Sequence, residues 1–328
     1  MNKNNYIKFL LLLLLFFAGC FFSLFYGGSE SSNLSNLSSG NFIFWNIRFP
    51  KTVTAVLSGA TLSVSGLILQ IIFRNPLAGP YVLGISSGAS LLVSVTILSG
   101  SGIGLFTNYF LGKSVVVLSS IAGSLLVTFL ILFLSKRISS NVILLLIGLM
   151  LGQVCGAIQG ALEYFANPND LKSFVMWSMG SLSGTTNSDL YIFVPVCLIC
   201  MLSLVFFIKP LNAFLLGQNY ATNVGVNYSQ NRFYLILISS VLTGITTAFC
   251  GPIAFVGIAV PLLSRMIFDT SQQKTHLFSC MLIGSIILLF SDVICHTFSK
   301  SSTLPINMIT TFVGAPRVIY LLFKNKQW

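Results

Sequence analysis

The stretch VILLLIGLMLGQVCGAIQGAL, which is Val142–Leu162, contains no charged side chain. A helix needs about 20 mostly apolar residues to cross a hydrocarbon core about 30 Å thick. This stretch therefore predicts a membrane-spanning helix. Nine other segments are also long and mostly apolar: Ile7–Tyr26, Thr52–Ile72, Val82–Leu98, Ser114–Leu134, Leu190–Ile208, Phe233–Cys250, Ile253–Phe268, His276–Thr297 and Pro305–Phe323. Val82–Leu98 and Ile253–Phe268 are the shortest of the ten.

The composition of the whole chain agrees with this pattern. Only 7% of its 328 residues are charged, against about 25% in an ordinary soluble domain. Hydrophobic residues make up 55% of the chain, and the mean hydropathy is +0.92. These values exclude a soluble enzyme, a disordered chain and a nucleic-acid-binding domain. We predict an all-α polytopic membrane protein, in which residues 1–328 form a single transmembrane domain with about ten spans.

The Lys and Arg residues predict the orientation, because short cytoplasmic loops are enriched in them. With the N-terminus inside, 12 of the 17 Lys and Arg residues fall inside, and the other five fall outside: Arg48, Lys51, Lys113, Lys172 and Lys300. Both termini are therefore predicted to be cytoplasmic. The start of the chain also resembles a lipoprotein signal, with a small residue before Cys20, but the apolar run continues past that cysteine, which favours a first spanning helix.

Two polar segments between the spans predict short helices. Leu171–Met179, on the outside, is expected to form an interfacial helix. Residues 211–232 form the longest inside segment, and Leu215, Leu216, Ala221 and Val224 give it an apolar stripe. An amphipathic segment between two spans is typical of a docking surface for a cytoplasmic partner. A solvated loop is an equal alternative.

The sequence contains no convincing catalytic or cofactor-binding motif. A P-loop for ATP is missing, since Thr107 replaces the first glycine before Gly112-Lys113-Ser114. No metal site or disulfide framework is predicted. Gly148, Gly152, Gly156 and Gly160 share one helix face, which predicts close helix packing and is also compatible with a transport pathway. Asp292 is the acid predicted to lie within a span, where a structural pairing and a transport role are equal alternatives.

Eight segments carry a resemblance to a known family. They read RFPKT (48–52), LSGATLSVSGLILQ (57–70), RNPLAGP (74–80), LGISSGA (83–89), WSMGSLSG (177–184), LGQNYATNVGV (216–226), GPIAFVGIAVP (251–261) and LPI with GAP (304–306 and 314–316). The chain resembles the FecCD-type permeases of bacterial ABC importers for ferric siderophores, haem and vitamin B12. The likeness extends from about Asn41 to Phe323.

This resemblance implies a set of partners and a location. The expected assembly contains two permeases, either a homodimer or a pair of paralogues, in the bacterial cytoplasmic membrane. Two cytoplasmic ABC ATPases and an extracytoplasmic substrate-binding protein complete it, whereas no cofactor or nucleic acid is expected. The expected cargo is an iron chelate, with a ferric siderophore favoured over haem or cobalamin. The permease itself is not an enzyme, because ATP hydrolysis belongs to the partner.

The resemblance also implies site residues. Arg48, Lys51 and His296 fall on positions that dock the binding protein, and we add Lys300, one turn from His296. Leu216, Gly217, Ala221 and Gly225 fall in the segment that seats on the ATPase, although Gln218 and Asn219 replace the family's usual acids there. Ser139, Ser140 and Asn141 fall at the inner gate of the pathway. The alternative is an ion-gradient-driven secondary transporter, for which Asp292 is the candidate residue.

Overall fold

The computed structural model describes residues 3–25, 42–103, 109–135, 141–297 and 304–324, and within these ranges it contains helices and no strand. The helices at the ten predicted segments are α1 (Lys3–Phe25), α2 (Phe49–Phe73), α3 (Ile85–Ile103), α4 (Tyr109–Ser135), α5 (Asn141–Phe165), α7 (Asn187–Ser203), α10 (Tyr228–Cys250), α11 (Val256–Ile267), α12 (Gln273–Thr297) and α13 (Ile306–Lys324). Between them lie the π-helix η2 (Phe44–Arg48), α6 (Pro168–Ser178), the 3-10 helix η3 (Leu204–Phe207), α8 (Ile208–Leu216) and α9 (Gln218–Asn223).

Helices lie at the predicted segments, but the number of ten crossings stays a prediction. Among the described residues, seven helical stretches are long and apolar enough to cross a membrane. Two shorter apolar helices, Ile85–Leu98 and Val256–Ile267, correspond to the two segments predicted to be short. The predicted division between Phe233–Cys250 and Ile253–Phe268 is also confirmed, since α10 ends at Cys250 and Gly251 has a φ of 73°. Helix α6 lies where the interfacial helix Leu171–Met179 was predicted, and its place at the membrane surface stays a prediction.

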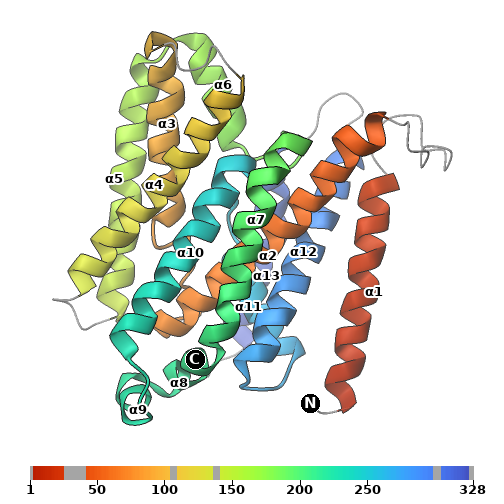
Figure 1. Ribbon diagram of the computed structural model, residues 1–328, viewed down its shortest axis with the longest axis vertical. Coiled ribbons are helices and arrows are strands. Elements are labelled where there is room, and N and C mark those ends of the chain that lie inside the picture. The colour runs from red at the N-terminus through yellow and green to blue at the C-terminus, as the bar shows by residue number, and fades with distance from the viewer. Residues whose placement is uncertain (1–2, 26–41, 104–108, 136–140, 298–303, 325–328) are drawn as a thin grey trace.

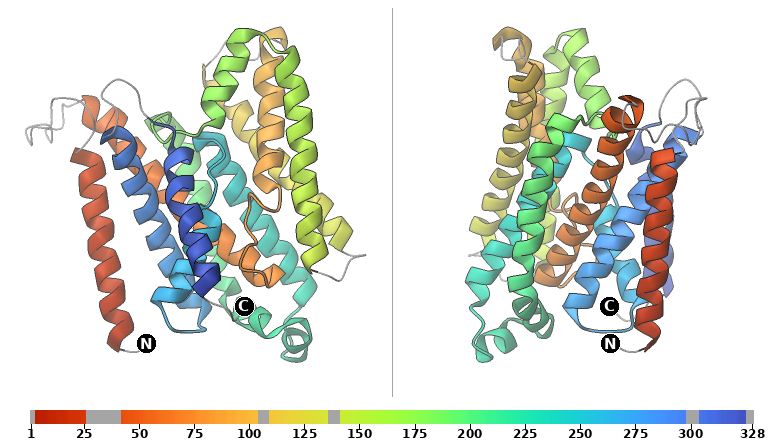
Figure 2. Two further views of the ribbon diagram at one scale, coloured as in Figure 1. Left: turned by 180° about the vertical axis from the view of Figure 1, so that it is seen from behind. Right: turned by 45° about the vertical axis from the view of Figure 1, so that its right-hand side comes forward.

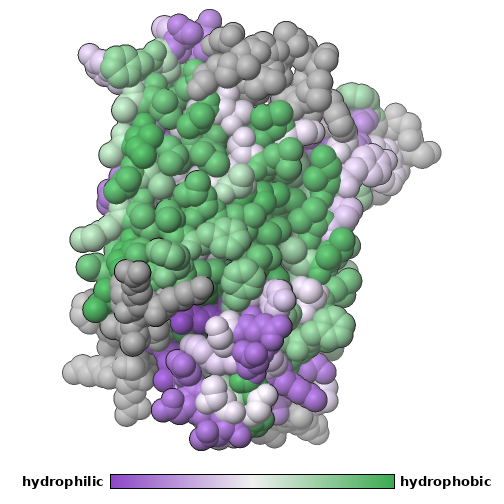
Figure 3. All heavy atoms as spheres, turned by 60° about the vertical axis from the view of Figure 1, so that its left-hand side comes forward, coloured by the Kyte–Doolittle hydropathy of each residue, from purple (hydrophilic) through white to green (hydrophobic). Residues whose placement is uncertain are grey.

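Helix α2 forms the centre of the bundle and packs against α10, α11 and α12 (Figures 1 and 2). In an 18-residue apolar part of the stretch that contains α2, 89% of the residues are buried, against 17% in the corresponding parts of the stretches that contain α1 and α7. The outer helices instead present large apolar side chains, such as Phe133 on α4 and Leu202 on α7. Figure 3 shows the result as a broad hydrophobic band above a hydrophilic end.

Glycine pairs bring these helices into close backbone contact. Gly59 of α2 lies against Gly284 of α12, Gly66 of α2 lies against Gly257 of α11, and Gly88 of α3 lies against Gly123 of α4. A Cβ atom at five of these positions would overlap the backbone of the partner helix, namely Gly59, Gly66, Gly88, Gly123 and Gly284. In a membrane the hydrophobic effect does not drive helices together, because lipid tails are as apolar as the side chains. Small residues at such crossings let the helices pack by close van der Waals contact instead.

Helix α10 is also held by hydroxyl groups on two of its sides. Towards α2, Ser65 hydrogen-bonds Ser239 and Thr243, and Thr61 hydrogen-bonds Thr246. Towards α4, the hydroxyl groups of Ser120 and Ser124 donate to the carbonyl oxygens of Gly244 and Ser240. These contacts fix α10 between its two neighbours, as polar side chains commonly do in helix packing within membranes.

The two ends of the bundle differ in what they contain. Helix α1 begins and α13 ends at the end where α8 and α9 lie (Figures 1 and 2). The start of α2, the end of α12 and α6 lie at the opposite end. The predicted coupling segment, the start of α1 and the end of α13 therefore share one end, as the charge pattern requires, while the assignment of that end to the cytoplasm stays a prediction.

Candidate functional site

At the end opposite α8 and α9, a buried ion pair joins α2 to α12. The Lys51 ammonium lies 2.9 Å from Asp292 Oδ2, and the two side chains are 4% and 3% exposed. Ser23 of α1 donates a hydrogen bond of 3.3 Å to the same carboxylate oxygen, and the hydroxyl groups of Ser23 and Thr52 lie 2.9 Å apart. Asp292 thus has a partner, which corresponds to the structural alternative left open by the sequence.

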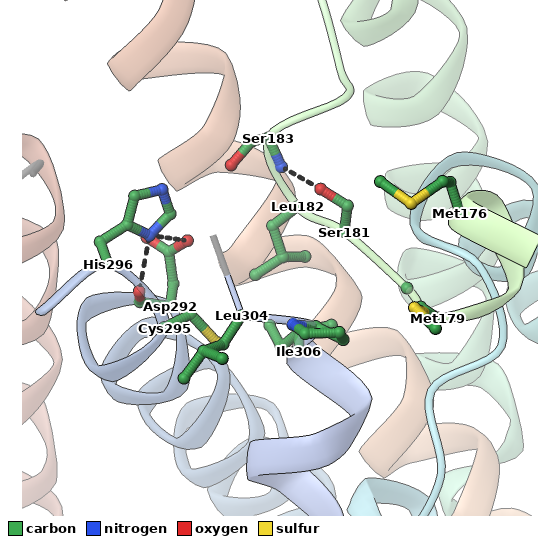
Figure 4. Close-up of a pocket in the computed structure, with 12 residues that line it drawn as sticks. Met176, Met179, Ser181, Leu182, Ser183, Asp292, Cys295, His296, Leu304 and Ile306 are labelled. Atoms are coloured by element: carbon green, nitrogen blue, oxygen red, sulfur yellow. Dashed lines mark hydrogen bonds and ion pairs between the residues drawn. The ribbon is translucent and has the colours of Figure 1, made fainter. Parts of the chain in front are cut away.

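His296 lies one turn beyond Asp292 on α12 and is partly exposed (Figure 4). Its Nδ1 atom lies 2.9 Å from the Asp292 carbonyl oxygen and 3.5 Å from Asp292 Oδ1. Because a carbonyl oxygen can only accept, we infer that Nδ1 carries the proton and donates it. Asp292, Cys295 and His296 line a cavity of about 100 Å³ together with the segment before α7 and the start of α13.

Arg48 ends the π-helix η2 and points back to α1. Its Nη1 atom donates to the carbonyl oxygens of Leu24 and Phe25, at 3.2 and 3.4 Å. These two residues end α1, where helical carbonyls have no partner within the helix and a cation is favourable. The guanidinium therefore joins the end of α1 to the start of α2.

Residues that dock a partner are expected at the surface, but Arg48 and Lys51 are both buried. In a low-dielectric interior each cation is stabilised by an internal partner, which the position of the residue in the chain did not reveal. His296 lies at the rim of the nearby cavity, and Lys300 lies outside the described residues. Binding-protein docking at this end stays a prediction, and direct contact with Lys51 would require the ion pair to open.

At the other end, residues 208–226 form two short helices joined by a sharp turn. Gly217, with a φ of 110°, separates α8 from α9. Helix α9 ends in a Schellman motif, in which the Val226 N–H bonds the Ala221 carbonyl at 2.9 Å and the Gly225 N–H bonds the Thr222 carbonyl at 3.0 Å. Gly225 supplies the left-handed conformation that this motif needs, with a φ of 83°.

The two faces of this segment differ. Leu211, Phe214 and Ala221 are buried in the bundle, whereas Leu216, Tyr220 and Val224 are exposed. The amphipathic prediction is therefore confirmed, but the expected stripe is not, because Ala221 points inward and Leu216 outward. Gly217 also packs inside the chain, against the Arg74 guanidinium, whereas nothing lies within 4 Å of a Cβ atom at Gly225.

The glycine face of α5 divides into two halves. Gly148 and Gly152 pack against Leu83, Gly84 and Ser87, so this half is a helix contact. Nothing lies within 4 Å of a Cβ atom at Gly156 or Gly160. As for the predicted gate, Ser139 and Ser140 lie outside the described residues and Asn141 begins α5, so it stays a prediction.

A polar groove of about 350 Å³ lies beside the open half of this face. Ser86, Ser87 and Ser90 of α3 line it, as do Gln153, Gln159 and Glu163 of α5. We did not predict these residues as a site. The signal in the sequence was the polar character of Gln153, Gln159 and Glu163 at intervals of six and four residues within an apolar helix.

The described residues contain no group of three or more His, Cys, Asp or Glu side chains that would hold a metal ion. All seven cysteines are free thiols in the structure.

Comparison with known proteins decides the family. The model of the FecCD transport family matches residues 10–324. The chain belongs to this family. As a FecCD chain it is 34% identical, over 293 residues, to a "Vitamin B12 import system permease protein BtuC" of Klebsiella pneumoniae, covering 88% of this chain and 85% of the relative. The protein with the same description from Pectobacterium atrosepticum is 35% identical over 286 residues, covering 86% and 82%.

Solved structures agree with the sequence matches. This FecCD chain superposes on a metal-chelate type ABC transporter in an inward-facing conformation with a TM-score of 0.85 and 28% identity, covering 98% of this chain and 99% of that one. PsaBC from Streptococcus pneumoniae, solved with a Fab, gives a TM-score of 0.54 at 18% identity over 89% and 98% of the two chains. The second match shows a shared fold alone.

Proposed function

We propose that this FecCD chain is the permease subunit of an ABC importer that moves an intact metal chelate across the bacterial cytoplasmic membrane. The observation that carries the proposal is the end-to-end likeness, in sequence to vitamin B12 import permeases and in structure to a metal-chelate type transporter. Such a match over nearly the whole chain is more specific than a shared helical architecture.

The proposed assembly places a different partner at each end. The assembly contains two cytoplasmic ATPases, and one of them binds the exposed side of α8 and α9 of this chain, where Leu216, Tyr220 and Val224 are exposed. The loaded binding protein docks at the opposite end, near His296. A second permease, a copy or a paralogue, completes the core. All ten helices cross the membrane in this proposal, with both termini in the cytoplasm.

The mechanism is alternating access driven by the ATPases, and the chain performs no covalent chemistry. Closure of the ATPase pair moves the α8–α9 segment, and the helices above it open or close the pathway. The polar groove beside α5 offers hydroxyl and amide groups, which suit a cargo that must bind weakly and leave. A ferric siderophore remains the proposed cargo, while the names of the relatives favour cobalamin, and haem is a third chelate of this kind.

Uptake by cells that lack the chain tests the proposal. Radiolabelled ferric siderophores, haem and cobalamin are supplied with and without depletion of ATP. Loss of one ATP-dependent uptake, restored by the chain, is the expected result, and it names the cargo. Uptake that needs the chain but follows the proton gradient and ignores ATP would support the secondary transporter instead.

A further inference from the structure

The central helix α2 ends at an arginine in an unusual conformation. Arg74 is the C-cap of α2, with φ 49° and ψ 40°. This left-handed region is usually occupied by glycine, because a Cβ atom is disfavoured there. In the described part of the chain, Phe255 is the other non-glycine residue with positive φ.

The Arg74 guanidinium lies on the turn between α8 and α9. Its Nη2 atom donates to the Leu215 carbonyl oxygen at 3.3 Å. A Cβ atom at Gly217 would meet three atoms of the same guanidinium as its nearest neighbours. One flat group thus packs on a glycine and binds a carbonyl two residues earlier. The packing on Gly217 needs the planar shape of an arginine, which a lysine lacks, whereas the hydrogen bond to Leu215 needs only an N–H donor.

This contact lies between the exposed side of the α8–α9 turn and the central helix α2. Leu216 and Tyr220, on the exposed side of the turn, are available to a partner. On the other side, α2 packs against α10, α11 and α12. Other contacts also hold α8, including a 2.9 Å hydrogen bond from the Gln273 N–H to Asn212 Oδ1 at the start of α12. Arg74 supplies a polar link from the turn itself to the central helix.

We propose that Arg74 is a positioning residue that transmits movement of the α8–α9 turn to α2, and so couples ATP hydrolysis to import. This inference rests on the proposed function, because the turn moves only if an ATPase docks on it. Arg74 is exposed, so its substitution should leave the fold intact.

The test uses proteoliposomes that hold the complete importer, loaded binding protein outside and Mg-ATP inside. Import and ATP hydrolysis are measured together for Arg74→Gln and Arg74→Lys, with Lys209→Gln as the control that removes an exposed cation from α8. We expect both Arg74 variants to assemble and hydrolyse ATP, with import per ATP reduced at least about fivefold, the lower end of typical coupling between sites. A structural defect would instead lower assembly and both rates together.

Gly217→Ala adds a second arm, since the new methyl group overlaps the guanidinium, and the φ of 110° also strains an alanine at this position. If both residues act through one contact, the double variant Arg74→Gln/Gly217→Ala has an import-to-hydrolysis ratio no lower than the worse single variant. An unchanged ratio in Arg74→Gln, an equal fall in Lys209→Gln, or multiplied losses in the double variant would overturn the inference. Absence of ATP-dependent import by the wild-type complex would instead overturn the proposed function on which the inference rests.

Discussion

The two ends of the bundle looked alike in sequence, as two candidate docking surfaces, but the structure separates them. At one end the expected contact residues, Arg48 and Lys51, are buried and bound to groups of the same chain. At the other end Leu216, Tyr220 and Val224 are exposed and apolar. The two basic residues beside the membrane span thus bind partners within the chain, whereas the three residues at the hydrophilic end remain exposed.

The difference teaches how each kind of residue marks an interface. A buried cation gains most from an opposite charge inside the protein, so basic residues beside a span are poor evidence of an exposed surface. Apolar side chains that project from a hydrophilic end are better evidence, because they gain free energy when a partner covers them. Four substitutions test this contrast, and they follow in order of expected effect.

The largest effect is expected where the ion pair is broken. Asp292→Ala leaves the Lys51 ammonium buried without its partner, which should lower the free energy of unfolding by about 3–5 kcal/mol. Thermal unfolding in detergent measures the change. The double variant Lys51→Met/Asp292→Leu is the control, and it should recover most of the loss because no charge remains buried. Equal loss in both variants would show that the pair is not the cause.

The next effect concerns the inward side of the α8–α9 segment. Ala221 is completely buried, so Ala221→Leu should overpack its site and lower stability by about 1–3 kcal/mol. Limited proteolysis of the purified chain, before any ATPase is added, detects this loss. A stable Ala221→Leu chain that fails only in ATPase binding would place Ala221 at the interface, as the sequence alone suggested.

The outward side should behave in the opposite way. Leu216→Ala removes an exposed side chain, so stability should change by less than about 0.5 kcal/mol. If Leu216 is at the centre of the ATPase contact, binding should weaken by more than about 1 kcal/mol. Titration of the ATPase onto the reconstituted chain measures the affinity, with Leu118→Ala as the control, because Leu118 is an exposed leucine in the first half of α4, away from this end. Equal affinity for all three chains would rule out this docking surface.

The smallest effect on the free energy of unfolding is expected for an uncharged contact in the middle of the bundle. Ser65→Ala removes hydroxyl contacts with Ser239 and Thr243 that involve no charge. The expected cost is about 0.6 kcal/mol, the mean for such contacts between membrane helices. The same unfolding assay compares it with Asp292→Ala. If Ser65→Ala lowered the free energy of unfolding as much as Asp292→Ala, charge would not explain the larger effect expected at the Lys51–Asp292 pair.

The helices were predictable because hydrophobic length is a local property of the chain. The division of the chain after Cys250 also followed from a local signal, whereas local signals left short helices and a solvated loop as equal alternatives where α8 and α9 lie. The pairing of Lys51 with Asp292 was not predictable, since 241 positions separate the two residues and only the packing of α2 on α12 joins them. The inward turn of Ala221 depends on how α9 rests on the bundle, which no periodicity over six residues specifies.

The central claim is that import depends on an ATPase docked on α8 and α9. The most direct measurement is uptake of a labelled chelate by proteoliposomes that contain the chain with or without its ATPase, each with or without internal Mg-ATP. We predict uptake only when the ATPase and Mg-ATP are both present, and its loss in Leu216→Asp. Uptake by the chain alone, driven by a proton gradient and unchanged in Leu216→Asp, would contradict the account.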